Sequence, residues 1–303
     1  MPSLQSPTGA LPARFRQTRV LIAGYGDIGQ RVARLLPRRV RVLALNREAG
    51  RVAALRAQGV RPLAGDLDEA ASLRRLAGIA SRVIHLAPPP ATGQDDPRTA
   101  ALLRALALRR PPLALVYGST SGVYGDCGGA LVAETRPLNP GTARARRRAA
   151  AEARVRAFGR LTGARASILR IPGIYAPDRE GGTPRQRLLQ GTPALALEDD
   201  VYTSHIHADD LARACIAALW RGKAQRAINA SDDSRLRMGE YFDLAADLYG
   251  LPRPPRISRA AARAALPPAL LSFMSESRRL DNTRLKRELR LRLRYPTPGG
   301  GLV

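Results

Sequence analysis

Hydroxyl and guanidinium groups that could take part in chemistry gather in two stretches of the sequence. Thr120, Ser121 and Tyr124 lie in the run GSTSGVYG, directly after an apolar segment of strand length. Hydroxyls there could bind a ligand at a strand end, or could form the polar turn that Ser, Thr and Gly favour. Arg144 and Arg148 belong to the run RARRR and stand one helical turn apart. Because arginine keeps its proton in proteins, this pair could bind an anion but could not act as a base.

A glycine motif near the start of the chain is typical of phosphate binding. Gly24, Gly26 and Gly29 have G-x-G-x-x-G spacing, after the apolar run VLIA and before apolar residues at helical spacing. Gly24 permits a tight turn, Gly26 lets the backbone approach a pyrophosphate, and Gly29 allows close packing of helix on strand. With Asp27 and Ile28 between them, these glycines predict a dinucleotide site at a helix N-terminus.

The end of the second apolar segment, Val40–Leu45, indicates which dinucleotide is bound. Asn46 and Arg47 stand where NAD-binding proteins usually carry an acid for the ribose 2′-hydroxyl. Arg47 could pair with a 2′-phosphate, and Asn46 has no carboxylate to repel it; the alternative is a solvated arginine at a helix start. We therefore expect NADP(H) to be favoured over NAD(H).

Other residues expected at the cofactor follow further predicted strands. They are Asp66 and Leu67 after the third strand, Leu86 and Ala87 at the fourth, and Pro172 after the sixth. Asp66 could contact the adenine end of a dinucleotide, or could instead cap the helix that follows. His85, beside Leu86, is expected to be a packed strand residue.

Alternating strands and helices must position all these residues. Apolar segments of strand length occur at residues 20–23, 40–45, 60–63, 82–86, 113–117 and 165–169, with helical patterns such as 97–109 and 142–162 between them. This alternation predicts βαβ units with right-handed crossovers. The fold class is therefore α/β, with a Rossmann-type doubly wound parallel sheet and a smaller C-terminal α/β lobe.

The predicted organisation has a tail and two folded parts. Residues 1–17 mix Pro, Ser, Gly and Arg without the apolar centre of a signal peptide, and we expect a mobile tail. Residues 18–172 form the dinucleotide-binding domain, to which residues 201–230 return. Residues 173–200 and 231–303 form the substrate lobe.

Composition argues against several other functions. The formal net charge is +25 over 303 residues, and arginine supplies almost all of the positive charge, since Lys223 and Lys286 are the lysines. The arginines are spread along the chain rather than gathered in one basic arm, so nucleic acid is not the expected partner. Cys127 and Cys215 lack metal-ligand spacing, and we predict no metal. No apolar run approaches the roughly 20 residues of a membrane span, and a cytoplasmic location is expected.

Several motifs, in their order along the chain, resemble those of the extended short-chain dehydrogenase/reductases, the nucleotide-sugar epimerase and dehydratase superfamily. They are AGYGDIG at 23–29, GDLD at 65–68, HLA at 85–87, STSGVYG at 119–125, RIPGIYAP at 170–177, HIHADDLARA at 205–214, INASDD at 228–233 and GGGL at 299–302. The resemblance implies an NAD(P) cofactor and redox or isomerase chemistry on a small or nucleotide-sugar-like substrate.

The resemblance also implies a catalytic arrangement from which this sequence departs. The family uses a Tyr-x-x-x-Lys pair on the helix after the fifth strand, and a Ser or Thr at that strand's end. Thr120 corresponds to the Ser or Thr, with Ser121 as an adjacent alternative. Arg144 and Arg148 fall at the Tyr and Lys positions. Arg148 could still hold cofactor ribose hydroxyls, while Arg144 would favour an anionic substrate.

Two functions follow from this pattern. One is an NADP-linked oxidoreductase or isomerase with an atypical base, for which Tyr175, His205 and His207 are further candidates. The other is a non-catalytic NADP-binding regulator or redox sensor. The family often dimerises through helices corresponding to residues 97–109 and 142–162, and we expect a homodimer.

Overall fold

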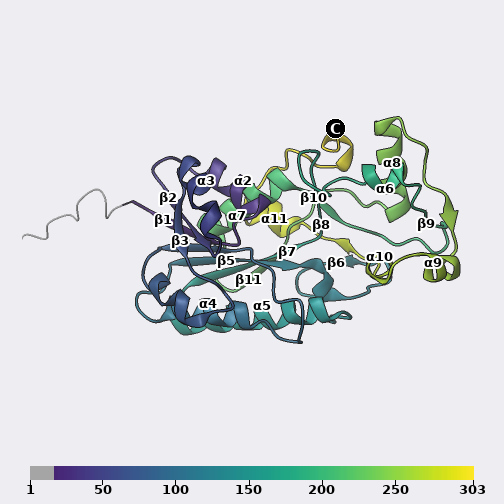
Figure 1. Cartoon of the computed structure of the whole chain (residues 1–303). Helices are drawn as coiled ribbons and strands as arrows, with labels where there is room; N and C mark the ends of the chain where they lie inside the picture. The colour runs from purple at the N-terminus through teal and green to yellow at the C-terminus, as the bar shows by residue number, and fades with distance from the viewer. Residues whose placement is uncertain (1–16) are drawn as a thin grey trace, which may run out of the picture.

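The computed structural model describes residues 17–303, apart from the side chains of Pro268, Ala269 and Phe273. The predicted tail at residues 1–17 thus lies outside the described residues except for its last position. Figure 1 shows a layered α/β body and, at the opposite end from the N-terminal strand, a smaller lobe formed largely by the C-terminal third. None of the helices within residues 17–303 combines the length and apolar character needed to cross a membrane.

A seven-stranded sheet forms the centre of the body. Its strand order is β11-β7-β5-β4-β1-β2-β3, and every neighbouring pair is parallel. The strands are β1 Arg19–Ala23, β2 Arg41–Asn46, β3 Arg61–Ala64, β4 Arg82–His85, β5 Ala114–Thr120, β7 Arg165–Ile171 and β11 Arg226–Asn229. The predicted Rossmann-type parallel sheet is confirmed, and the chain returns to it through β11 after building part of the lobe.

Helices cover both faces of this sheet because its central strands are apolar on both sides. On one face, Val20 and Ile22 of β1 pack in a core with α2 (Asp27–Leu35), α3 (Val52–Ala57) and α7 (Ala208–Arg221). On the other face, Leu21 and Ala23 pack with α4 (Pro97–Ala107), α5 (Ala143–Thr162) and the 3₁₀ helix η2 (Ala70–Leu76). Figure 1 shows α4 and α5 side by side beneath the sheet.

Local sequence explains where the two long helices on that face begin. The Asp96 side chain accepts a hydrogen bond from the backbone of Thr99 at 3.0 Å, and Pro97 occupies the first turn of α4. Thr142 caps α5 in the same way through the backbone N–H of Ala145, at 3.2 Å. Both predicted starts are confirmed. Between β2 and β3 the chain forms a 3₁₀ turn, η1 (Ala49–Arg51), before the short α3, because Gly50 disfavours a regular first turn.

The remaining elements are short and build the lobe and its junction with the sheet. Three two-stranded parallel sheets pair β8 with β10, β9 with β12, and β6 with β13. Their strands are β6 Leu131–Val132, β8 Gly173–Tyr175, β9 Ala194–Leu195, β10 His205–His207, β12 Arg256–Ile257 and β13 Arg279–Leu280. The helices are η3 Ser121–Tyr124, α6 Arg185–Leu189, α8 Met238–Tyr249, α9 Arg259–Ala265, α10 Pro268–Phe273, α11 Thr283–Arg287 and η4 Pro298–Gly300. A separate apolar core around Tyr241 and Phe242 of α8 holds the lobe together.

Candidate active site

A groove made of two adjoining cavities runs along the carboxyl edge of the seven-stranded sheet. We call them the main cleft, of about 550 Å³, and the outer pocket, of about 290 Å³; Gly24 and Gly26 line both. All twelve residues predicted at the cofactor line this groove. The main cleft takes Gly24, Gly26, Asp27, Ile28, Gly29, Leu86 and Pro172, and the outer pocket takes Asn46, Arg47, Asp66, Leu67 and Ala87.

The three motif glycines have the geometry that their separate roles require. Gly24 has a φ of +95°, and a Cβ there would lie 2.3 Å from the backbone nitrogen of Ala87. A Cβ on Gly29 would lie 2.9 Å from the backbone oxygen of Gly24. A Cβ on Gly26 would meet no atom within 4 Å, so the backbone is bare toward the groove. Tight turn, close packing and open approach are the features that fit a dinucleotide pyrophosphate at the start of α2.

The carboxylate at the start of α2 is paired with two arginines. Asp27 accepts hydrogen bonds from Arg31 at 2.9 Å and from Arg179 at 2.5 Å. Arg31 is buried and also binds Asp178 and Asp209, each at 2.6 Å, which ties α2 to the loop after β8 and to α7. Arg179 therefore offsets the negative charge of Asp27, while Arg31 is shared among three carboxylates.

The outer pocket carries a basic cluster of which the sequence analysis found only one member. Arg47 keeps 61% of its side chain exposed and lies 3.9 Å from the carboxylate of Glu48. Arg51 lines the same pocket and donates to the backbone oxygen of Tyr25 at 3.1 Å. Asn46 donates to the backbone oxygen of Glu48 at 2.6 Å. The i, i+4 spacing of the two arginines was the available signal for Arg51.

The predicted alternative that Asp66 caps a helix is wrong. Its carboxylate accepts from the backbone N–H of Asp68 at 3.0 Å, which forms a local turn. The next helix, η2, begins at Ala70, and Glu69 precedes it without a capping side-chain bond. Asp66 instead lines the outer pocket.

At its other end the main cleft opens into a larger space of about 620 Å³, which we call the inner cavity. Thr120, Arg144 and Arg179 line both the main cleft and the inner cavity, whereas Ser121 lines the inner cavity. Thr120 is the last residue of β5, and its hydroxyl accepts from the backbone of Gly122 at 3.2 Å. The end of β5 therefore holds its hydroxyls where the two spaces meet.

The paired arginines of α5 both reach the main cleft. Arg148 donates to the backbone oxygen of Gly118 at 2.7 Å and to the Tyr117 hydroxyl at 3.2 Å, with its guanidinium 5.7 Å from the Tyr117 ring centre. Arg144 lies at the cleft mouth with an exposed side chain. Desolvation by the cleft walls lowers the pKa of Arg144, and the charge of Arg148 lowers it further. Arg144 and Arg146 are exposed, whereas Arg148 is half-buried.

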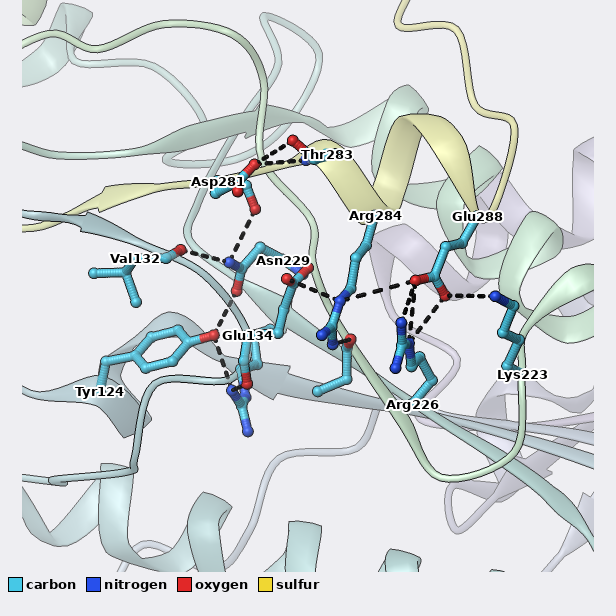
Figure 2. Close-up of polar contacts among 12 residues, drawn as sticks. Tyr124, Val132, Glu134, Lys223, Arg226, Asn229, Asp281, Thr283, Arg284 and Glu288 are labelled. Atoms are coloured by element: carbon cyan, nitrogen blue, oxygen red, sulfur yellow. Dashed lines mark hydrogen bonds and ion pairs between the residues drawn. The ribbon is translucent and has the colours of Figure 1, made fainter.

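Tyr124 lies outside both spaces, in a buried polar network. Its side chain is 1% exposed; its hydroxyl donates to Asn229 at 2.7 Å and accepts from Arg170 at 2.8 Å. Figure 2 shows Tyr124 pointing toward Asn229, which links it to Val132 and Asp281. Tyr124 lines neither the main cleft nor the inner cavity, so its hydroxyl supports the fold, and burial raises its pKa.

A buried ion pair that the sequence analysis missed lies beneath the end of β5. Glu152 of α5 accepts from Arg170 of β7 at 2.8 and 3.2 Å and from the Ser119 hydroxyl at 2.7 Å. Both charged side chains are almost fully buried. The sequence offered only a glutamate and an arginine far apart, because no local spacing connects α5 with β7.

The other candidate bases are held away from the main cleft. Tyr175 and His205 line a fourth space, of about 390 Å³, and His205 stacks on Tyr241 at 4.1 Å. Burial lowers the pKa of His205 to about 4 and raises that of Tyr175. His207 accepts from the backbone of Asp209 at 3.2 Å and thereby caps α7.

His85 is the packed strand residue that the sequence predicted. It is 1% exposed and forms a 2.8 Å hydrogen bond with the Thr99 hydroxyl. Burial lowers its pKa to about 4. A neutral, enclosed imidazole of this kind supports the packing of α4 on β4.

Fold and site together define a dinucleotide-binding α/β protein, and comparison with known proteins gives its family. The family model described as NAD dependent epimerase/dehydratase family matches residues 20–231, so the chain belongs to this family. No curated protein sequence matches the chain significantly.

Solved structures share this fold over almost the whole chain. A functionally unknown conserved protein from Silicibacter pomeroyi DSS is 31% identical, with 94% of this chain and 96% of that chain covered and a TM-score of 0.76. PA4631, a nucleoside-diphosphate-sugar epimerase from Pseudomonas aeruginosa, is 20% identical, with 94% and 95% covered and a TM-score of 0.77. UDP-glucuronic acid 4-epimerase from Bacillus cereus in complex with NAD is 18% identical, with 94% and 96% covered and a TM-score of 0.74.

Proposed function

We propose that this protein is an NAD(P)-dependent oxidoreductase or isomerase with an atypical active site, acting on a small or nucleotide-sugar-like substrate. The observation that carries the proposal is the continuity of the outer pocket, main cleft and inner cavity along one sheet edge. A dinucleotide could lie along the first two, and a substrate would reach it from the third. Membership of the NAD-dependent epimerase/dehydratase family supports the same arrangement.

The residues where the main cleft meets the inner cavity would have roles that differ from those of the family's Tyr and Lys pair. The bound nicotinamide supplies the hydride acceptor or donor. Thr120 and Ser121 would bind and orient a substrate hydroxyl or carbonyl at the end of β5. Arg148 would hold cofactor ribose hydroxyls with the N–H groups not directed at Gly118 and Tyr117. Arg144 would stabilise negative charge on the substrate, since it cannot accept a proton.

The basic outer pocket favours NADP(H) over NAD(H). Arg47 and Arg51 would neutralise a 2′-phosphate, and Asn46 adds no charge. Glu48 and Asp66 are the opposing features; the side chain of Glu48 is 56% exposed and stands beside Arg47. Since Arg98 also lines the pocket, three arginines face two carboxylates, and the excess of positive charge would favour a phosphate.

Nicotinamide fluorescence titrations test this preference. The unmutated protein should bind NADPH at least tenfold more tightly than NADH, and Arg47→Ala should remove most of that difference, because a charge-assisted contact contributes about 1.5–3 kcal/mol. Arg56→Ala, an exposed arginine on α3, is the matched control and should leave the ratio unchanged. Equal affinities for NADPH and NADH in the unmutated protein would refute the NADP assignment.

A second observation favours a competing function. Arg144 and Arg148 stand at the positions of the family's acid–base pair, which suits a non-catalytic NADP-binding regulator or redox sensor. Absorbance at the nicotinamide band, with NADP⁺ and a panel of alcohols and nucleotide sugars, separates the two functions. Turnover with any substrate supports the enzyme, whereas tight NADPH binding without turnover across the panel supports the regulator.

The variant carrying both Arg144→Tyr and Arg148→Lys refines that comparison. If Arg144 only replaced a lost base, the double variant should gain dehydrogenase or epimerase activity on nucleotide sugars, since a positioned general base contributes about 10²- to 10⁴-fold. If Arg144 holds an anionic substrate, the variant should lose substrate affinity instead. A double variant identical to the unmutated protein in activity and affinity would exclude both roles.

A further inference from the structure

The edge of the seven-stranded sheet that lies opposite the groove is lined with arginines. Because every pair of neighbouring strands is parallel, the first residues of all seven strands lie along this edge, which we call the amino edge. Arginine is the first residue of six strands, namely Arg19, Arg41, Arg61, Arg82, Arg165 and Arg226. The remaining strand, β5, begins at Ala114, shortly after Arg109 and Arg110. The fold therefore gathers arginines that are spread along the sequence.

The segments at the amino edge contain no acid that could balance this charge. The first residues of the seven strands and the turns before them include twelve Arg or Lys and no Asp or Glu. They are residues 17–19, 36–41, 59–61, 77–82, 107–114, 162–165 and 220–226. The helices that cover the sheet run back to this edge, and their last turns are also basic, with Arg34 in α2, Arg104 in α4 and Arg160 in α5. The amino edge therefore carries a concentrated positive charge.

Part of this charge stabilises the fold, and most of it faces solvent. Arg82 and Arg165 donate to backbone oxygens at the C-terminal end of α7, at 2.9 and 3.3 Å. Arg226 is paired with Glu288 of α11. The exposed members are Arg38, Arg39, Arg41, Arg61, Arg109, Arg110, Arg221 and Lys223. Within residues 17–303, the one ion pair that involves this exposed set joins Lys223 to Glu288, at 3.8 Å. The exposed cations are thus available to an extended anionic surface.

The amino edge also exposes leucines among these cations. Leu108 and Leu113 stand on either side of two exposed arginines and are 60% and 59% exposed. Leu161, in the last turn of α5, is 86% exposed, and Leu35 at the end of α2 is 41% exposed. Surfaces that bind nucleic acid are polar and positively charged. Leucines set among basic residues suit a lipid surface instead, because the leucines can enter the boundary between headgroups and acyl chains.

An apolar cavity of about 530 Å³ lies at the same edge. Leu36, Val40, Ile216 and Trp220 line it, together with the exposed Arg39. Apolar walls beside a guanidinium match a molecule that joins hydrocarbon to phosphate, as a phospholipid does. The cavity therefore favours lipid over nucleic acid as the partner of this edge.

We propose that the amino edge docks the protein on membranes that contain anionic phospholipids. The exposed arginines bind the headgroup phosphates, and Leu108, Leu113 and Leu161 enter the interface. The protein would lie on the membrane without crossing it. Figure 1 shows the start of β1 at the end of the molecule opposite the lobe, so docking leaves the groove at the carboxyl edge open to solvent. The inference does not depend on the proposed function.

Binding of the full chain to lipid vesicles tests the proposal. One set of vesicles is pure phosphatidylcholine, and the other contains three parts of phosphatidylglycerol to seven of phosphatidylcholine. In 0.1 M NaCl, sedimentation should show binding to the anionic vesicles about tenfold or more tighter than to the neutral ones. Trp220 is the single tryptophan of the chain and lies at the amino edge, so energy transfer from it to a dansyl-labelled lipid shows which end of the protein faces the vesicle.

Variants without four of the exposed arginines locate the charged part of the surface. The test variant carries Arg38→Gln, Arg39→Gln, Arg109→Gln and Arg110→Gln. It should bind anionic vesicles about tenfold or more weakly, because each basic residue near such a surface contributes about fivefold. The matched control removes the same charge from exposed arginines of the lobe and its junction with the sheet, by Arg136→Gln, Arg185→Gln, Arg235→Gln and Arg263→Gln. It should keep most of the affinity. Since all eight side chains are exposed, the midpoint of thermal unfolding should be the same in both variants.

A pair of leucine variants tests the apolar part of the surface. Leu108→Ser with Leu161→Ser should weaken binding to anionic vesicles about fivefold or more without changing the net charge. Leu189→Ser with Leu197→Ser, at lobe residues that are 65% and 67% exposed, is the matched control and should bind as the unmutated protein does. Competition with a DNA duplex at equal phosphate concentration separates lipid from nucleic acid.

Four results would overturn the proposal. The first is equal binding to neutral and anionic vesicles. The second is an equal loss of affinity in the two arginine variants, which would indicate a general effect of the net charge of +25. The third is bound protein without energy transfer from Trp220. The fourth is displacement from vesicles by the DNA duplex together with unchanged vesicle binding by the Leu108→Ser, Leu161→Ser protein, which would assign the amino edge to nucleic acid.

Discussion

Arg148 shows how much a single side chain changes at the position that the family resemblance gives to lysine. One nitrogen of its guanidinium, Nη1, donates to both Gly118 and Tyr117, and the planar group lies over the aromatic ring of Tyr117. The sequence predicted this position correctly as part of the cleft. It did not predict the burial of Tyr124, because the turn of η3 at Gly125, with a φ of +66°, directs the tyrosine inward.

The titration of Asp232 should make a contribution to the pH dependence of stability that is opposite in sign to that of the buried histidines His85 and His205. Asp232 is 2% exposed, and burial raises its pKa to about 7. Because the folded state holds the proton more tightly than the unfolded chain, this contribution to stability is complete below about pH 4 and is lost as pH rises through about 7. The contribution of Asp232 to the free energy of unfolding should fall by up to about 4 kcal/mol over that range.

Asp232→Asn should flatten that fall, and urea unfolding at pH 5 and pH 8 measures it. The asparagine oxygen can still accept the hydrogen bonds that Ser234 donates to Oδ1 at 2.5 and 3.0 Å, so folding should persist. Asp247→Asn, on the surface, serves as the control. The contribution of His85 and His205 is common to both proteins, so the assignment fails if the change in stability between the two pH values is the same in Asp232→Asn as in the unmutated protein.

Helix α5 is the element that joins the site to the core. Arg144, Arg148 and Glu152 are spaced four residues apart and so share one face, which runs from the exposed cleft mouth to a side chain with 1% exposure. Glu152 ends this series in the buried pair with Arg170, which continues through Tyr124 and Asn229 to the contacts shown in Figure 2. The start and end of α5 could be predicted from Thr142 and Gly163. The contacts made by this face could not be predicted, since its partners lie on β5 and β7.

Removing one partner of that pair should destabilise the protein strongly. Glu152→Ala leaves the guanidinium of Arg170 buried without its carboxylate, and we expect a loss of about 3–5 kcal/mol in the free energy of unfolding. Replacing both, with Glu152→Leu and Arg170→Met, should recover part of the loss. Urea denaturation gives both values, and a Glu152→Ala cost below about 1 kcal/mol would contradict a structural role for the pair.

On the scale of the whole molecule, the carboxyl edge of the parallel sheet brings the site residues together, and the lobe encloses the site. The alternation of apolar and helical patterns was enough to predict the sheet, because each βαβ unit is local in sequence. The lobe could not be predicted in detail, because its strands are two or three residues long and pair across gaps such as Gly173–Tyr175 with His205–His207. Some arginines also form hydrogen bonds with residues far away in the sequence. Arg82 donates to the backbone oxygen of Leu219, and Arg156 donates to that of Gln225. No spacing in the sequence predicts these contacts.

The central claim is that the groove along the sheet edge binds a nicotinamide dinucleotide, and one titration tests it most directly. Gly26 has a φ of −88° and open space where a Cβ would stand, so Gly26→Ala should fold normally while its methyl group blocks approach of the pyrophosphate. NADPH fluorescence is titrated into the unmutated protein, Gly26→Ala and the control Gly50→Ala, another glycine with open space around it.

We predict saturable NADPH binding to the unmutated protein and to Gly50→Ala, and affinity about tenfold or more weaker in Gly26→Ala, as expected for a steric cost of 1–3 kcal/mol. Undiminished binding by Gly26→Ala, or no binding by the unmutated protein, would contradict the account.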